Sequence, residues 1–176
     1  CNGSGYTTLL RLSGATTPPT ALTNAHAELP SQSTGTYANN VVCCNGGASA
    51  IGNNCAATNK EIFNRLSAVT NAHVQETSVN TYGTNACLSD TTPGDVITVG
   101  YQNTNCSGYD TTLLSMSASD NATVGDGNAY TRKVCATITP QILTFDLDTY
   151  NTSTTTTNTV PSYSVDLGVL TTGTVT

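Results

Sequence analysis

Cysteine is the residue type that carries the most evident chemistry in this sequence. Thiols join as disulfides, bind metal ions as thiolates or act as nucleophiles, and their spacing helps to separate these uses. No Cys-x-x-Cys pair of the kind found in zinc sites occurs, and Cys43 and Cys44 are adjacent. We therefore predict a disulfide framework formed in an oxidising compartment, with at least one cysteine unpaired because the number is odd. The seven candidates are Cys1, Cys43, Cys44, Cys55, Cys87, Cys106 and Cys135.

The two histidines stand in the same context, which raises the question of a metal or catalytic site. His26 and His73 each end a Thr-Asn-Ala-His stretch, but the corresponding stretch at Asn121 has Thr123 instead. No carboxylate is placed consistently beside them, and the Gly-x-Ser-x-Gly nucleophile motif is absent. We therefore expect hydrogen-bonding histidines, and we predict no catalytic residue, no metal site, no cofactor and no enzymatic activity.

Asparagine supplies a third kind of candidate site. The acceptor motif of N-glycosylation, Asn-x-Ser/Thr, occurs at Asn2, Asn105, Asn121 and Asn151. Several such motifs arise by chance in a sequence rich in Asn and Thr, so they are candidates for modification and not evidence of it.

These residues recur in one order along the chain, which indicates an internal repeat. Each copy reads cysteine, two apolar residues three positions apart followed by serine, then Asn-Ala-x, tyrosine and a closing cysteine. We predict repeats over residues 1–54, 55–105 and 106–139, followed by a C-terminal segment with a Thr-rich linker over 140–176. We expect Cys1 to be the first residue of a repeat rather than the lipidated first residue of a bacterial lipoprotein.

The repeat leaves two disulfide schemes open. One scheme joins cysteines across short turns, and the turn signal Pro93-Gly94 lies between two of them. We favour this scheme because its loops are shorter; it consists of Cys44–Cys55 and Cys87–Cys106, with Cys1–Cys43 as an additional pair. The other scheme joins the first and last cysteine of each repeat, as Cys1–Cys43, Cys55–Cys87 and Cys106–Cys135.

The elements that position these residues are predicted to be mainly β. Thr, Val and Tyr are enriched, and Gly and Asn clusters interrupt the chain at intervals of about ten residues. The apolar pairs three residues apart are an exception, because this spacing suits a helical turn better than a strand. We therefore predict small disulfide-stapled β-rich repeats with one short helical turn each, around residues 9–12, 63–66 and 113–116.

After Pro140 the repeat stops and a C-terminal β-strand segment is predicted. Residues 142–148 and 163–169 alternate apolar and polar side chains, and a Thr-rich linker separates them. A strand near the end of a chain has an edge to which a neighbouring subunit's strand can add. The candidates for this intermolecular pairing are Val165, Leu167, Val169 and Leu170.

Composition excludes several classes of function. Charged residues make up 9% of the 176 residues, against about 25% in an average protein, and the net charge is −6. Five Lys and Arg residues cannot neutralise a phosphate backbone, so no nucleic-acid partner is predicted. No apolar run reaches the roughly 18 residues that span a membrane. The 35 Thr and 18 Asn instead predict an uncharged surface rich in hydroxyls and amides.

The motifs resemble those of tandem-repeat, cysteine-containing secreted surface proteins of bacteria. The resemblance rests on Leu-Ser, then Thr-Asn-Ala-His, then Tyr and Cys in the repeats. Two motifs of the tail, Phe145-Asp-Leu-Asp148 and Val165-Asp-Leu-Gly168, resemble the β-domain that follows such repeats. The resemblance implies an extracellular structural or adhesive role and no defined enzyme site.

Three functions are therefore weighed. We predict an extracellular, self-associating structural protein that is a subunit of a cell-surface fibre or filament. One alternative is a monomeric adhesin module that binds a surface glycan, with stacking surfaces at Tyr6, Tyr101, Tyr109 and Tyr130. Another alternative is a secreted hydrolase.

Overall fold

The computed structural model describes residues 1, 5–14, 22–32, 37, 40–45, 50–92 and 94–140. The chain divides into two compact units, 1–141 and 142–176, and all described residues lie in the first. The elements of the described residues are β-strands, which confirms the predicted mainly β class, and these residues contain no helix that could cross a membrane.

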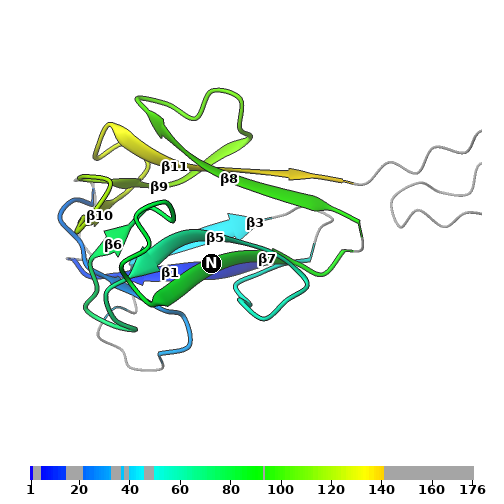
Figure 1. The fold of residues 1–176 in the computed structure, drawn as a ribbon, viewed down its shortest axis with the longest axis horizontal. Helices are drawn as coiled ribbons and strands as arrows, with labels where there is room; N and C mark the ends of the chain where they lie inside the picture. Colours follow the sequence, from blue (N-terminus) through cyan, green and yellow to red (C-terminus); the bar gives the residue numbers. More distant parts are fainter. Residues whose placement is uncertain are drawn as a thin grey trace, which may run out of the picture. The chain divides into compact units, whose positions relative to one another are not determined.

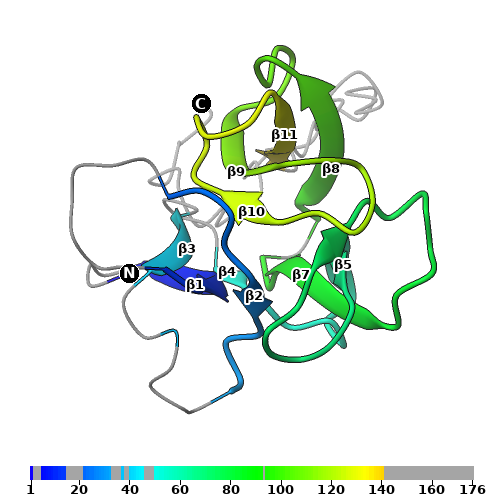
Figure 2. The same cartoon turned by 90° about the vertical axis from the view of Figure 1, so that its left-hand side faces the viewer.

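The eleven strands form three small antiparallel sheets. The orders of the strands are β2-β1-β3, β4-β7-β5-β6 and β10-β9-β11-β8 (Figures 1 and 2). The strand bounds are β1 (Tyr6–Leu12), β2 (Ala27–Glu28), β3 (Asn40–Asn45), β4 (Ile51–Gly52), β5 (Asn59–Leu66), β6 (Val74–Gln75), β7 (Thr84–Asp90), β8 (Val96–Asn103), β9 (Thr111–Met116), β10 (Val124–Gly125) and β11 (Arg132–Thr139).

The predicted helical turns are wrong, because each of these stretches belongs to a strand. The pairing register shifts by one residue at Leu9 in β1, Phe63 in β5 and Leu113 in β9. Such a β-bulge sets two residues of one strand opposite a single residue of its partner. The alternation of side chains therefore changes phase at the bulge, and Leu9 and Leu12 are both buried, as are Phe63 and Leu66. A bulged strand thus produces the spacing that is typical of a helix.

The favoured disulfide scheme is wrong in two of its three pairs. The disulfides are Cys1–Cys43, Cys55–Cys87 and Cys106–Cys135, with Cα atoms 5.5, 5.3 and 5.5 Å apart. The turn that follows Cys87 does not make a hairpin, because β7 before it and β8 after it belong to different sheets. Each disulfide instead joins the first and last cysteine of one predicted repeat.

Cys44 is the free cysteine, and the predicted Cys44–Cys55 pair is therefore absent. Successive residues of a strand point to opposite faces. Cys43 reaches Cys1 on one face, while the Cys44 side chain is buried in the core on the other. Burial raises the pKa of the Cys44 thiol because it disfavours the thiolate.

One hydrophobic core serves all three sheets. The buried apolar residues of β1, β5 and β9 belong to a single cluster, which includes Leu10, Phe63 and Leu114. Aliphatic side chains and alanines make up most of this cluster, in keeping with two Phe and no Trp in the sequence. The sheets therefore stabilise one another by burying a common apolar surface.

Several predictions lie outside the described residues. They are the two C-terminal strands at 142–148 and 163–169, the intermolecular candidates Val165, Leu167, Val169 and Leu170, and the glycosylation candidates Asn2 and Asn151.

Candidate functional site

Backbone strands from the three predicted repeats meet at what we call the three-way junction, made of residues 24–29, 71–76 and 121–126. Each stretch exchanges a reciprocal pair of backbone hydrogen bonds, 2.8–2.9 Å long, with each of the other two. The residues that pair are Ala25 with Val124, Ala27 with Ala72, and Val74 with Ala122. The junction therefore closes a ring, in which every predicted repeat is bonded to both others.

The Asn-Ala sequence of the repeats has a physical reason at this junction. Asn24, Asn71 and Asn121 have φ angles of 52°, 48° and 45°, a left-handed conformation that Asn adopts more easily than most residues. The alanines that follow them are at most 1% exposed, so the close approach of three backbones leaves no room for a larger side chain. The recurring Asn-Ala pair is therefore required by the backbone geometry.

The recurring tyrosines link each stretch of the junction to another. Two of them donate a hydroxyl hydrogen bond to an asparagine side chain, and the third accepts an asparagine N–H. The contacts are Tyr37 to Asn71 Oδ1 at 3.1 Å, Tyr82 to Asn121 Oδ1 at 3.0 Å, and Asn24 N–H to Tyr130 at 2.7 Å. Each tyrosine thus joins one predicted repeat to a different one.

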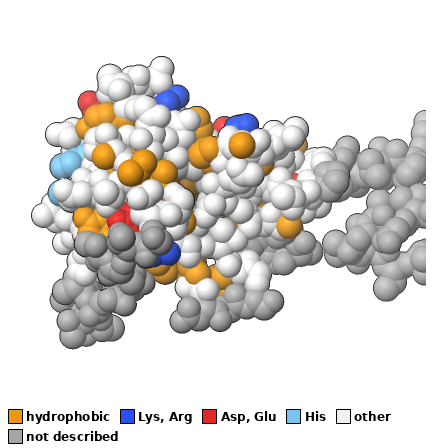
Figure 3. Space-filling model, turned by 90° about the horizontal axis from the view of Figure 1, so that it is seen from below, with side chains coloured by type: hydrophobic (Ala, Val, Ile, Leu, Met, Phe, Trp, Pro, Cys, Tyr) orange, Lys and Arg blue, Asp and Glu red, His pale blue; other side chains and the backbone are white. Residues whose placement is uncertain are grey.

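The two histidines lie beside each other at the junction. His26 Nδ1 is 2.6 Å from Asn71 Oδ1, His73 Nδ1 is 3.0 Å from the Asn121 carbonyl oxygen, and the ring centroids are 4.7 Å apart. Both rings reach the surface, where Figure 3 shows them in pale blue. Hydrogen bonding is the role that the sequence predicts for them. Within the described ranges, no three His, Cys, Asp or Glu side chains gather as metal ligands.

The recurring serines hold the end of the first strand of each predicted repeat, which is β1, β5 or β9. In every repeat the serine hydroxyl accepts the N–H of the residue after Asn-Ala, and the serine N–H donates to the carbonyl of that residue. The pairs are Ser13 with His26, Ser67 with His73, and Ser117 with Thr123, with N···Oγ distances of 2.7, 3.0 and 3.0 Å.

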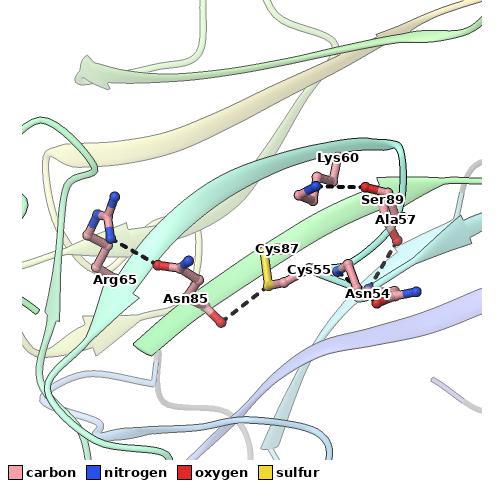
Figure 4. The surroundings of a disulfide bond; sticks show 9 residues. Asn54, Cys55, Ala57, Lys60, Arg65, Asn85, Cys87 and Ser89 are labelled. Carbon is pink, nitrogen blue, oxygen red and sulfur yellow. Dashed lines mark hydrogen bonds between the residues drawn. A yellow bond between two sulfur atoms is a disulfide. The ribbon is translucent and has the colours of Figure 1, made fainter. Parts of the chain in front are cut away.

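The surroundings of the Cys55–Cys87 disulfide show what such a bond joins (Figure 4). Two residues before Cys87 in β7, the Asn85 side chain accepts a hydrogen bond from Arg65 of β5 at 3.1 Å. Next to Cys55, the N–H of Asn54 donates to a serine hydroxyl of β7 at 3.1 Å. The disulfide therefore fixes a region that hydrogen bonds already hold against β7, and reinforces it covalently.

An ion pair with a buried carboxylate and a partly exposed guanidinium connects the second and third predicted repeats. Glu76, which is 5% exposed, accepts a hydrogen bond from Arg132 and thereby raises the pKa of the guanidinium. The neighbouring Gln75 is fully buried, and its carbonyl oxygen accepts the N–H groups of Thr81 and Tyr82 at 2.8 and 2.7 Å. Such satisfied polar groups in a core favour one arrangement of the elements over others.

Strand β8 covers the outer edge of β11 along its whole length. Its residues pair with β11 from Val96 opposite Thr139 to Asn103 opposite Arg132. Tyr101 on this strand also reaches β5, because its hydroxyl donates to the Phe63 carbonyl at 2.8 Å. The same hydroxyl accepts a backbone N–H at 3.0 Å, and burial raises the pKa of Tyr101.

The corresponding edge of β3 carries no strand among the residues that the structure describes. β3 is the last strand in the order β2-β1-β3, whereas β7 is covered by the short β4 and β11 by β8. A hollow of about 520 Å³ lies beside this edge. Its lining includes Asn40, Val41, Val42 and Leu113.

The remaining site predictions fall in different places. Asn105 and Asn121 are exposed, so both glycosylation candidates lie at the surface and stay predictions. Of the four tyrosines considered for glycan stacking, Tyr6 is 49% exposed, while the hydroxyls of the half-buried Tyr101 and Tyr130 are engaged in hydrogen bonds to other strands and loops of the fold. Tyr109 packs directly over Gly100, whose lack of a side chain makes room for the ring. Tyr6 is therefore the best placed of the four for stacking.

The visible surface is largely uncharged. Figure 3 shows a face on which acidic and basic side chains are few and widely spaced.

Three disulfides indicate that the protein matures in an oxidising environment, which is consistent with an extracellular location. Comparison with models of known families, with curated proteins and with solved structures finds no match.

Proposed function

We propose that this chain is an extracellular structural protein, a self-associating subunit of a cell-surface fibre or filament. The observation that carries the proposal is the covalent and hydrogen-bonded closure of the first unit: one disulfide in each predicted repeat and a ring of backbone bonds among the three. The recurring residues thus hold the three predicted repeats together. A subunit of a fibre needs such bonds because it must resist unfolding under tension. Disulfides that limit unfolding also limit cleavage by extracellular proteases.

We also propose that the three repeats are copies of one structural unit. The recurring cysteines and serines make equivalent contacts in all three, and each recurring tyrosine is hydrogen-bonded to the junction asparagine of another predicted repeat. A unit of this size cannot bury enough apolar surface alone, so copies that share one core support one another.

Low charge supports self-association. With 9% charged residues, neighbouring copies repel one another weakly at close range. Threonine and asparagine side chains offer hydrogen bonds across a contact between subunits without the desolvation cost of buried charges.

Electron microscopy of the protein isolated from its source, without refolding or reductant, tests this function. Regular filaments are expected. A control sample treated with reductant should lose them, because the modules unfold. Dispersed particles of 18.1 kDa in the untreated sample would contradict the proposal and favour a monomeric adhesin.

A further inference from the structure

We propose that His26 and His73 bind one divalent ion of the late first-row transition metals at the three-way junction, with the Nε2 atom of each ring as a ligand. Imidazole nitrogen is a preferred ligand of Cu²⁺, Ni²⁺ and Zn²⁺, and of these ions Cu²⁺ binds most tightly to a given set of ligands. The site does not require self-association, so it goes beyond the proposed function.

Hydrogen bonds fix which nitrogen of each neutral ring carries the proton. His73 Nδ1 lies 3.0 Å from the Asn121 carbonyl oxygen, which accepts hydrogen bonds but cannot donate one. His26 Nδ1 lies 2.6 Å from Asn71 Oδ1, an acceptor that the Tyr37 hydroxyl also uses. A neutral imidazole that donates from Nδ1 has its lone pair on Nε2. Histidines that bind metal ions commonly donate the N–H of their other ring nitrogen to a carboxylate or carbonyl oxygen in this way.

The distance between the two rings suits two ligands of one ion. An ion about 2.0–2.1 Å from Nε2 lies about 3 Å from the ring centroid, so two rings that share it at square-planar or tetrahedral angles have centroids about 4.5–5 Å apart. The observed centroids are 4.7 Å apart, and the rings are tilted by 46° and not stacked face to face. Both rings are half-buried and reach the surface, so an ion has access from solvent (Figure 3).

The backbone of the junction holds both histidines in place. The residues on either side of each histidine exchange reciprocal hydrogen bonds with the other two stretches of the junction, as Ala25 and Ala27 do around His26. Ligands that are held in advance lose less conformational entropy when they bind. One ion therefore joins the first and second predicted repeats through side chains that the fold has already placed.

The third stretch of the junction has a threonine at the equivalent position. The hydroxyl of Thr123 lies 3.2 Å from the hydroxyls of Ser117 and Tyr130, so it is engaged in the fold. The chain thus supplies two imidazole ligands, and water fills the remaining positions of the ion, as in open metal sites. This agrees with the described residues, which bring no three His, Cys, Asp or Glu side chains together.

The other strong ligands for these ions are engaged elsewhere. His26 and His73 are the two histidines of the chain, and six of the seven cysteines form disulfides. The seventh cysteine, Cys44, is buried, as is the one methionine, Met116. An ion that is bound through imidazole must therefore use His26, His73 or both.

Titration with Cu²⁺, followed by calorimetry and by electron paramagnetic resonance, tests the site. We expect one ion per chain and a spectrum with two nitrogen ligands. The variants His26→Asn and His73→Asn remove Nε2 but keep an N–H donor near the position of Nδ1, and circular dichroism checks their fold. Losing a group that only orients a ligand costs about 10–100-fold in metal affinity, so losing the ligand itself should cost at least about tenfold. Each variant should also leave one nitrogen in the spectrum.

A gain of affinity provides the matched test. Thr123→His adds a third imidazole at the equivalent position, so it should bind Cu²⁺ more tightly than the native protein and show a third nitrogen. Thr58→His is the control, because Thr58 is exposed in the loop before β5 and lies outside the junction; it should not tighten binding.

Three results would overturn the proposal. The first is a native spectrum with a single nitrogen ligand. The second is unchanged Cu²⁺ affinity in the double variant His26→Asn/His73→Asn, which would show an adventitious ion only. The third is equal affinity of Thr123→His and Thr58→His.

Discussion

The sheets of the first and third predicted repeats contain the same three strands, a long strand, a two-residue strand and a strand with the closing cysteine. They differ on the outer edge. β11 has the eight-residue β8 beside it, with Tyr101 extending to β5, whereas β3 has a hollow. The comparison shows that β8 does more than extend the third sheet, because Tyr101 also connects this sheet to β5 of the second.

The largest effect is expected from breaking what both sheets share, the disulfides. Each bond stabilises by about 2–4 kcal/mol, so reducing all three should unfold the unit or lower its Tm sharply. Thermal unfolding followed by circular dichroism, with and without reductant, measures this. An unchanged Tm in reductant would show that the covalent closure is dispensable.

The second largest loss of stability is expected from removing the Tyr101 side chain, which connects the third sheet to β5. Tyr101→Ala deletes a packed ring and two hydrogen bonds, at a cost of about 2–3 kcal/mol in the free energy of unfolding. Urea denaturation provides the value. Tyr6→Ala, at the start of β1 in the first sheet, removes a 49%-exposed ring and should cost less than about 0.5 kcal/mol. Equal losses would mean that Tyr101 does not tie β8 to β5.

A substitution at the three-way junction is expected to lower the free energy of unfolding by a smaller amount. Asn71→Ala forces alanine into a φ of 48° and removes the acceptor of Tyr37, for about 1–2 kcal/mol. Asn80→Ala is the matched control, since Asn80 has a φ of 56° but lies outside the junction. The excess loss in Asn71→Ala over Asn80→Ala, measured by urea denaturation, reports the junction contacts alone. No excess would reduce the role of Asn71 to backbone geometry.

The smallest effect concerns pH. Burial raises the pKa of Tyr101, so the folded state holds this proton more tightly than the unfolded chain does. The contribution of Tyr101 to the free energy of unfolding is therefore fully present below pH about 10, the pKa in the unfolded chain. This contribution is lost as the pH rises from there through the raised pKa of the folded state. Tyr101→Phe should therefore show a shallower decline above pH 10 in short urea titrations. Parallel declines would contradict the contribution of Tyr101.

The residues that join the predicted repeats could be recognised from the sequence, whereas the course of the strands could not. The recurring Cys, Ser, Asn-Ala and Tyr were visible as a pattern, and each now has a contact that explains it. The bulges at Leu9, Phe63 and Leu113 were not visible, because a phase change in a strand gives the same apolar spacing as a helical turn.

The disulfide scheme depends on which strands share a sheet. A Pro-Gly turn after Cys87 predicts a hairpin locally, but β8 leaves that sheet and pairs with β11 instead. Long-range strand pairing therefore decides which cysteines meet, and neither local propensity nor spacing encodes it.

Amide hydrogen exchange of β1, β5 and β9 in the native protein and in Asn71→Ala tests the central claim, that the three predicted repeats hold one another in one closed unit. The account predicts that the amides of all three strands exchange faster in the variant than in the native protein, because each predicted repeat is bonded to both others. Faster exchange confined to β5, the strand of the altered repeat, would contradict it.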